Sequence, residues 1–295
     1  MEYHIHYILL VSIALIWGSQ YIFNELALQE LTPFGLMIIR IFFGFVTLTF
    51  LILLIPGERA KRLHLTKKLF VLFIVIGAVE AAIPFFLIAY GQLHVTSSIT
   101  AIIMGLIPMI TILLERLMRH RGKITLTEGI GLTVGFAGLI VLINPVSDSL
   151  HSTLLGFLSI SMAAFCFALA LILMAKIPKE ISSLHATRFI LMIYALPLML
   201  VWLFLNNHSL ALSDSTWLSV IILGIFSSGI VYLLYLKLIR LAGASFTALS
   251  NYLVPLVGTA LGVYFFNEPF TWNIALSLLL IVSALFIIKG TSETD

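Results

Sequence analysis

The stretch LFVLFIVIGAVEAAIPFFLIAY, residues 69–90, contains one charged side chain, Glu80, among 22 residues. A helix rises about 1.5 Å per residue, so a run of about 20 apolar residues crosses the ~30 Å hydrocarbon core of a bilayer. Residues 69–90 are therefore predicted to form a transmembrane helix. Glu80 lies near its centre, at the depth where a charged group costs most.

Nine further runs of this kind occur along the chain, and the overall composition agrees with them. Hydrophobic residues make up 61% and charged residues 10% of the 295 residues, and the mean hydropathy is +1.16. Soluble domains have about 45–50% apolar and about 25% charged residues, so a water-soluble protein is excluded. The predicted fold is an all-α integral membrane protein with ten transmembrane helices in a lipid bilayer. The predicted spans are residues 7–26, 34–55, 69–90, 98–117, 127–143, 153–175, 185–205, 216–236, 245–266 and 271–288.

The Lys and Arg residues are distributed unevenly among the loops. Fourteen of the sixteen lie in or beside the loops that follow spans 2, 4, 6, 8 and 10, and the other two, Arg40 and Arg188, lie inside spans. Loops rich in Lys and Arg stay in the cytoplasm. Both termini are therefore predicted to be cytoplasmic, in a multi-pass protein of the cytoplasmic (plasma) membrane. A net charge of +3 divided among short loops provides no basic surface for nucleic acid, which is excluded as a partner.

The two halves of the chain show weak internal similarity. A shift of 147 residues aligns Gly77 with Gly224 and Pro108 with Pro255, and a shift of 148 aligns Arg40 with Arg188. Five spans in each half place the halves in opposite orientations, which is the inverted-repeat architecture of secondary transporters. The predicted repeats are residues 1–147 and 148–295.

Several short motifs accompany this topology. They are Trp17-Gly18 in the first span, Pro33 and Arg40 at the start of the second, and the series Ser245, Thr247, Ala248, Pro255 and Glu268 in the second half. In this order the sequence resembles, over its whole length, the EamA branch of the drug/metabolite transporter superfamily. The resemblance implies export or uptake of amino acids and other small metabolites. The position equivalent to Glu268 in the first half is Arg121, where the family has a second glutamate.

Glu80 is the first candidate for a functional site. A carboxylate at this depth usually faces a cavity or a partner. Three roles stay open: a proton carrier, a group that binds a substrate ammonium, or a fixed partner of a cation or a hydroxyl network between helices. The equivalent residue in the second half is Ser227, so the charge has no counterpart there.

Polar side chains in the first two spans form a second group of candidates. Trp17, Gln20, Tyr21 and Asn24 recur at helical spacing and so share one face of the first span. They could bind a polar metabolite or bond to neighbouring helices. Arg40 could bind a substrate carboxylate through two parallel hydrogen bonds, or extend to the interface and cap carbonyl groups.

Spans 8 and 9 add Tyr232, Asn251 and Tyr252. Together with Glu80 and the polar face of the first span, they are predicted to line a substrate cavity among spans 1, 3, 8 and 9.

Prolines are predicted to interrupt three of the helices. Pro108 and Pro255 each remove a backbone hydrogen bond from span 4 or span 9, which produces either a pair of hinges or two static bends. Pro84, one turn after Glu80, is expected to free a carbonyl group and loosen the helix beside that glutamate.

The sequence contains no phosphate-binding GxxxxGK[ST] motif and no HExxH motif, and its eight histidines and single Cys166 show no metal-ligand spacing. No ATP, metal or other cofactor is expected, and the protein is predicted not to be an enzyme.

The predicted function is secondary transport of a small polar, amino-acid-like metabolite, outward and by alternating access, with a proton as the candidate coupling ion. An importer of a cationic metabolite or drug is the alternative, and a non-transporting membrane sensor is less favoured. Gly131 and Gly135 allow close helix packing within one chain or between two, so the oligomeric state stays open, with a homodimer as one candidate.

Overall fold

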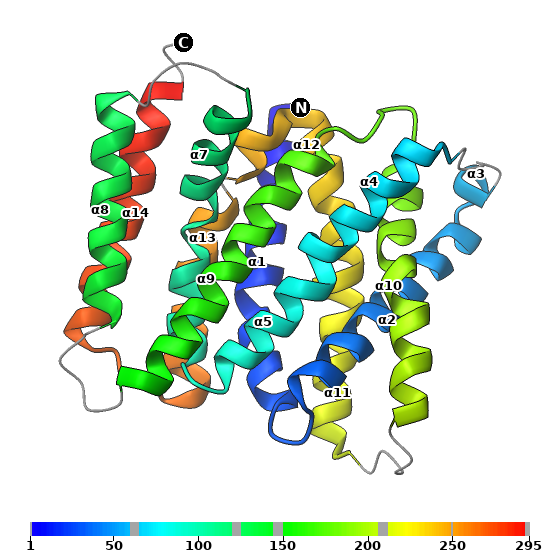
Figure 1. The fold of residues 1–295 in the computed structure, drawn as a ribbon, viewed down its shortest axis with the longest axis horizontal. Coiled ribbons are helices and arrows are strands. Elements are labelled where there is room, and N and C mark those ends of the chain that lie inside the picture. The colour runs from blue at the N-terminus through cyan, green and yellow to red at the C-terminus, as the bar shows by residue number, and fades with distance from the viewer. Residues whose placement is uncertain are drawn as a thin grey trace.

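The computed structural model describes residues 2–59, 65–119, 125–143, 150–205, 212–248 and 250–292. These residues form helices and no strand. The helices run up and down in one bundle, and both termini lie at the same end of it (Figure 1). We call this the terminal end, where α1 begins and α14 ends. The opposite, distal end is where α1 ends and α6 begins.

The first half of the chain forms the first eight α-helices and one π-helical segment. They are α1 (Glu2–Ala27), α2 (Pro33–Leu54), α3 (Pro56–Arg59), α4 (Lys67–Gly77), η1 (Ala78–Ala82), α5 (Ile83–Gln92), α6 (Ser97–Met104), α7 (Ile107–Arg119) and α8 (Leu126–Ile143). The second half follows a similar order, without a counterpart of α3 and with a single helix where the first half has α6 and α7. It contains α9 (Leu150–Met174), α10 (Ser183–Leu205), α11 (Asp214–Ile222), η2 (Leu223–Ile230), α12 (Val231–Ala248), α13 (Ser250–Phe266) and α14 (Trp272–Ser292).

Helical segments overlap all ten predicted spans. Among the described residues, seven helical spans are long and apolar enough to cross a membrane, and three shorter apolar helices cover residues 129–142, 253–266 and 272–284. The prediction of a multi-pass helical membrane protein is confirmed. The ninth span differs at its start, because α12 continues to Ala248 with an interruption at Gly243, whose φ is 83°. Glycine adopts this left-handed conformation without the steric cost that a Cβ atom adds.

Side chains that cap helices fix several of the helix starts. Each cap oxygen accepts a hydrogen bond from a backbone amide of the first turn, which typically contributes about 1 kcal/mol. The caps are Thr32 for α2, Thr66 for α4, Thr96 for α6 and Ser213 for α11.

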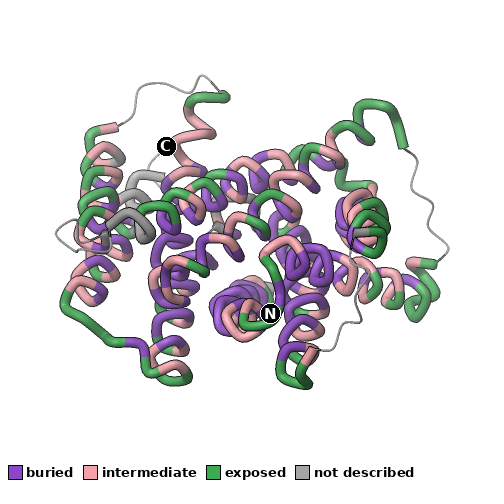
Figure 2. The backbone as a smooth tube through the Cα atoms, turned by 60° about the horizontal axis from the view of Figure 1, so that its bottom comes forward, coloured by how far each residue is buried: buried purple, intermediate pink, exposed green. Residues whose placement is uncertain are grey.

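Large apolar side chains cover the outside of the bundle. Leu126, Phe204 and Trp272 are 82%, 81% and 76% exposed, whereas Phe73, Ile76 and similar residues inside the bundle are not exposed at all. Figure 2 shows buried residues along the inner helix faces and exposed residues along the periphery. Such an exterior requires lipid, because exposed apolar patches of this extent are unfavourable in water.

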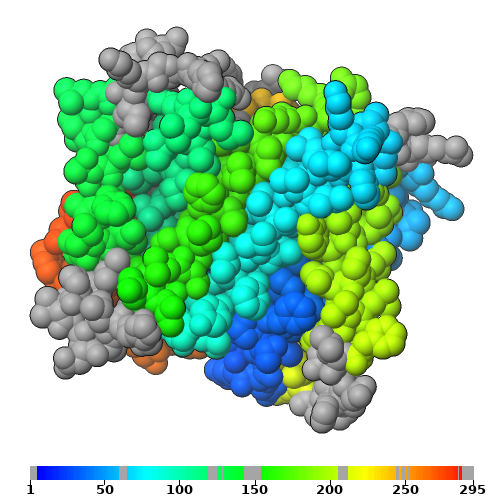
Figure 3. All heavy atoms as spheres, in the orientation of Figure 1, coloured from blue at the N-terminus to red at the C-terminus, as the bar shows by residue number. Residues whose placement is uncertain are grey.

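The helix contacts are reciprocal between the two halves. α2 packs on η2 as α10 packs on α4, and α1 packs on α13 as α9 packs on α7. α5 and α9 lie side by side across the face seen in Figure 3. α8 and α14 pair at one edge of the bundle (Figure 1), where a Cβ atom at Gly138 would lie 3.0 Å from Ile281. Gly135 and Gly138 of α8 thus make close contacts within the chain.

Gly77 and Gly224, which the internal similarity aligns, make equivalent contacts. A Cβ atom at Gly77 would lie 2.7 Å from the ring of Tyr194 in α10, and one at Gly224 would lie 2.2 Å from Cβ of Phe43 in α2. Each glycine therefore allows a helix of one half to approach a helix of the other. Close helix packing therefore explains why a glycine occurs at this position in each half.

The two π-helical segments also occupy equivalent positions, since η1 shifted by 147 residues falls inside η2. In η1 the amide of Ile83 donates to the carbonyl of Ala78, five residues back. Pro84 has no N–H group, so the carbonyl of Glu80 lacks its usual helical donor. The hydroxyl of Tyr232 donates to that carbonyl instead, at 2.7 Å. The Glu80 carbonyl, whose helical donor Pro84 removes, is thus bonded by a side chain of the second half.

Candidate functional site

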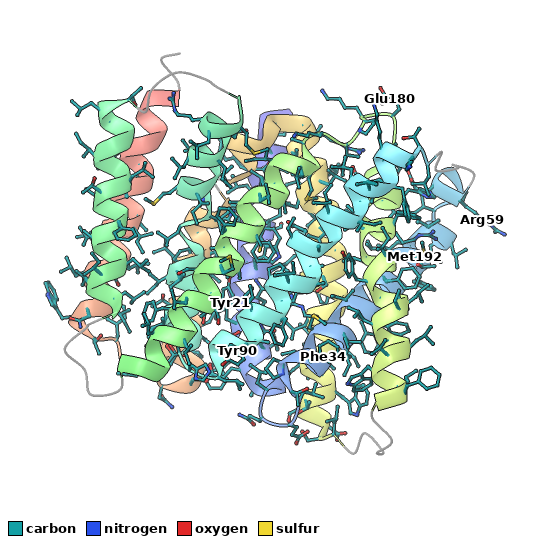
Figure 4. All side chains as sticks on the ribbon, viewed as in Figure 1. Tyr21, Phe34, Arg59, Tyr90, Glu180 and Met192 are labelled. Atoms are coloured by element: carbon teal, nitrogen blue, oxygen red, sulfur yellow. The ribbon has the colours of Figure 1, made fainter. Side chains whose placement is uncertain are left out.

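A small pocket lies inside the bundle between helices of both halves. Its cavity volume is about 10 Å³, roughly the room that one water molecule needs. Tyr21, labelled in Figure 4, lies well inside the bundle, while Phe34 and Tyr90 mark the distal end. The wall consists of Trp17, Gln20, Tyr21, Met104, Ile107, Phe167, Tyr235, Asn251 and Val254.

Four residues predicted from sequence line this pocket: Trp17, Gln20, Tyr21 and Asn251. The helices differ in part from those expected, because α6, α7 and α9 contribute to the wall and span 3 does not. Glu80 is consequently not in the wall. Tyr232 is not in the wall either, and its hydroxyl donates to the carbonyl of Glu80 at 2.7 Å.

Aromatic rings form one side of the pocket. The ring of Trp17 lies edge to face with Tyr235, at 4.6 Å between centroids, and with Tyr232, at 6.0 Å. Tyr232 also stacks on Phe85 at 6.2 Å. Such pairs contribute about 0.5–1.5 kcal/mol each beyond the area they bury. The rings therefore form a stiff surface on which an apolar part of a ligand can rest.

Arg40 lies next to the pocket and is 1% exposed. Its Nη2 donates to Gln20 Oε1 at 2.9 Å, and its Nη1 donates to Asn24 Oδ1 at 3.3 Å. Its Nε donates to Ser228 Oγ at 3.0 Å, and its Cζ lies 3.7 Å from the centre of the Phe85 ring. All of these partners are neutral.

A chain of hydrogen bonds continues from Arg40 toward the distal end. Asn24 Nδ2 donates to Gln92 Oε1 at 3.0 Å, and Gln92 Nε2 donates to the carbonyl of Tyr21 at 2.9 Å and to Ser97 Oγ at 3.3 Å. Ser97 Oγ bonds in turn to the carboxylate of Glu25. The polar face predicted on the first span therefore bonds to neighbouring helices and also borders the pocket.

Glu268 closes this network at the distal end. Its two oxygens accept hydrogen bonds from the backbone amides of Ser97 and Ser98, at 3.1 and 3.0 Å. These amides begin α6, where a helix offers free N–H groups and partial positive charge. A residue of the second half thereby holds a helix of the first half.

Glu80 is 2% exposed, and both of its carboxylate oxygens lack a hydrogen-bond partner in the described part of the chain. The hydroxyl of Ser227, its equivalent in η2, lacks one as well. No fixed pair with a cation of the described residues accounts for Glu80. Its carboxyl group keeps its full capacity to bond to a proton or a ligand.

The prolines occupy different positions within their helices. Gly105 and Leu106 separate α6 from α7, so Pro108 is the second residue of α7, whereas Pro255 lies inside α13. A Cβ atom at Gly105 would lie 2.8 Å from Cγ of Pro255, so the two interrupted helices touch beside the pocket. Tyr252 belongs to α13, and its side chain is outside the described residues.

Sequence reasoning missed the roles of Gln92, Ser97 and Phe85, and it assigned no contact to Glu25 or Glu268. Gln92 and Ser97 lie just outside two predicted spans, where polar residues are ordinary. Phe85 lies in an apolar run whose residues give no sign of which one faces Arg40. Only the packing of distant segments brings these side chains together.

Comparison with known proteins identifies the family. The EamA-like transporter family matches the sequence over residues 4–144 and again over residues 154–290. The chain belongs to this family. It is therefore a multi-pass membrane protein of the EamA transporter type, and a transporter is not an enzyme.

The sequence is also similar to two uncharacterized transporters of Bacillus subtilis. The chain is 24% identical over 283 residues to the uncharacterized transporter YoaV of Bacillus subtilis (strain 168), and the aligned residues cover 94% of each chain. It is 29% identical over 258 residues to the uncharacterized transporter YyaM of the same organism, covering 85% of this chain and 83% of that one. A solved crystal structure superposes with a TM-score of 0.67 over 97% of both chains at 17% identity, and shows the same fold.

Proposed function

We propose that this EamA-type protein is a secondary transporter of the cytoplasmic membrane that exports a small polar, amino-acid-like metabolite. In this proposal residues 1–147 and 148–295 are two inverted five-helix repeats that rock about the pocket. The reciprocal helix contacts, the equivalent π-helical segments and the paired contacts of Gly77 and Gly224 support it.

The observation that carries the proposal is a pocket lined by helices of both halves that has room for about one water molecule, which is too small for a metabolite. A substrate can enter only if the helices that meet there move apart. On the distal side Glu268 joins the two halves, so opening on that side requires these bonds to break. A closed distal side with a pocket behind it is one state of an alternating-access cycle.

We place the terminal end in the cytoplasm. Arg59 and Lys67 flank the loop between α3 and α4 at that end, and Lys176 and Lys179 lie in the loop before α10. A loop excess of Lys and Arg marks the cytoplasmic side.

Glu80 is the proposed coupling group. Burying an ionised carboxylate without a partner costs several kcal/mol, whereas the protonated group or a group bound to a cation avoids that cost. Binding and release of a proton at Glu80 would thus change the energy of the closed bundle. This links the proton to the rocking of the two halves.

The test is Glu80→Gln, with Ser227→Ala as the matched control. Both residues are buried in π-helical segments at equivalent positions, and neither side chain has a hydrogen-bond partner in the described residues. Purified variants in liposomes are assayed for exchange of a panel of radiolabelled amino acids and organic acids across a pH gradient. We expect Glu80→Gln to lose the response to the gradient and Ser227→Ala to keep it. An unchanged response in Glu80→Gln would refute the coupling role, and no exchange by the wild type would refute transport of these compounds.

A further inference from the structure

Arg40 is a buried cation whose hydrogen-bond partners are all neutral. It is among the largest fully buried side chains of the described residues, yet oxygen atoms of Gln20, Asn24 and Ser228 and the ring of Phe85 are the partners that surround it. No carboxylate of the described residues forms an ion pair with it. A buried cation held only by neutral groups retains a large part of its desolvation cost.

The guanidinium also retains free donors. An arginine has five N–H groups, and three of those of Arg40 are used, one on each nitrogen. One N–H remains on Nη1 and one on Nη2. A carboxylate fits two N–H groups of this fork in plane, which an amide with its single oxygen cannot do.

Gln20 connects this cation to the pocket. Its side chain lines the pocket, and its Oε1 lies 2.9 Å from Arg40 Nη2. The amide oxygen therefore occupies the position that an oxygen of an anionic ligand would take. A ligand in the pocket reaches the guanidinium once the Gln20 side chain turns aside.

We propose that Arg40 is the site for a single carboxylate group of the substrate, and that Gln20 occupies this site when the substrate is absent. The rest of the ligand lies on Trp17 and Tyr235, among Met104, Ile107 and Val254. The substrate class is a small monocarboxylic acid or amino acid with an apolar body. A doubly charged phosphate is disfavoured, because one cation supplies a single compensating charge. This inference rests on the proposed transport function and narrows its substrate.

The experiment uses binding to the full chain in detergent, so it does not require transport. The probes are leucine, phenylalanine and 4-methylpentanoate, each compared with its primary amide, and inorganic phosphate. The readouts are the shift of Tm and the change of tryptophan fluorescence, to which Trp17 in the pocket contributes. We expect at least one acid to bind wild type ten times or more tightly than its amide, and phosphate not to bind.

Gln20→Glu places a carboxylate permanently against Arg40, whereas Gln20→Met removes the amide and adds no charge. We expect Gln20→Glu to keep or raise Tm without ligand and to lose at least tenfold in affinity for the acid. Gln20→Met is expected to lose threefold or less. The proposal is overturned if wild type binds none of the acids, if acid and amide bind equally, or if Gln20→Glu binds the acid as wild type does. Transport of neutral or cationic compounds without acid binding would refute this inference and the amino-acid-like substrate, but would leave secondary transport by alternating access intact.

Discussion

Glu80 and Glu268 are the same residue type in two regions of one bundle, and both are buried, with 2% and 7% of their surfaces exposed. Glu268 accepts hydrogen bonds from the backbone amides of Ser97 and Ser98, where α6 begins. Both oxygens of Glu80 lack a partner in the described residues. The carboxyl group of Glu268 binds a helix N-terminus, and the carboxyl group of Glu80 does not.

This difference separates a group that holds the fold from one that is free to act. Hydrogen bonds to a charged group contribute about 1.5–3 kcal/mol each, so the bonds of Glu268 favour the packed state of the two halves. Glu80 lies inside η1, where the backbone amides are used by carbonyl groups. Both carboxyl groups are buried, so burial does not show which one is structural. Their hydrogen-bond partners show it.

The largest effect is expected for Glu268→Leu. The amides of Ser97 and Ser98 would lose their acceptor, and each buried N–H group left unpaired costs about 1–3 kcal/mol, or together about 2–6 kcal/mol. The measurement is thermal unfolding in detergent, followed by the reaction of a thiol-specific dye with Cys166, which is buried in the folded chain. Glu268→Gln keeps one acceptor oxygen and should lose about half as much.

Glu80→Leu removes the buried carboxyl group that has no hydrogen-bond partner in the described residues. Replacing an unpaired buried carboxyl group by an apolar side chain is expected to leave stability unchanged or raise it by about 1–4 kcal/mol. The same dye assay applies. If Glu80→Leu and Glu268→Leu lowered the stability equally, the hydrogen bonds of Glu268 would not contribute to stability.

A smaller loss is expected for Tyr232→Phe. The Tyr232 hydroxyl replaces the amide donor that Pro84 removes from the carbonyl of Glu80, and an unpaired buried carbonyl costs about 1–3 kcal/mol. In a Pro84→Ala background residue 84 can donate from its own amide, so Tyr232→Phe should cost less there. Additive losses in this double-mutant cycle would contradict the exchange of donors.

The sequence was sufficient for those features that depend on local composition. Hydropathy places the helices, because crossing lipid demands about 20 apolar residues. The depth of Glu80 and the shared face of Trp17, Gln20 and Asn24 follow from helical spacing. Pro84 indicated a weakened helix at η1, whereas no proline lies in η2 to signal a second π-helical segment.

The partners of these groups depend on packing between distant segments. Ser97 and Glu268 are 171 residues apart, and Arg40 and Ser228 are 188 apart. The pocket wall likewise includes Phe167 of α9, which the sequence did not place near the first span. Weak internal similarity aligned the halves but gave no information on which faces meet.

The smallest effect is expected for Glu30→Gln, which tests whether burial gives the Glu268 bonds their value. Glu30 also accepts a hydrogen bond from a backbone amide at a helix start, that of Ser213 before α11, at 2.8 Å, but it is fully exposed. This bond lowers the pKa of the Glu30 carboxyl below its usual value, about 4.3. The contribution to stability is therefore present above that usual value and is lost as the pH falls through the lowered pKa. Because water and salt screen an exposed charge, Glu30→Gln should lower Tm only slightly at pH 7, and the difference from wild type should shrink as the pH falls toward 3. A loss as large as that of Glu268→Gln, or one that grows in acid, would show that burial is not what distinguishes the two carboxylates.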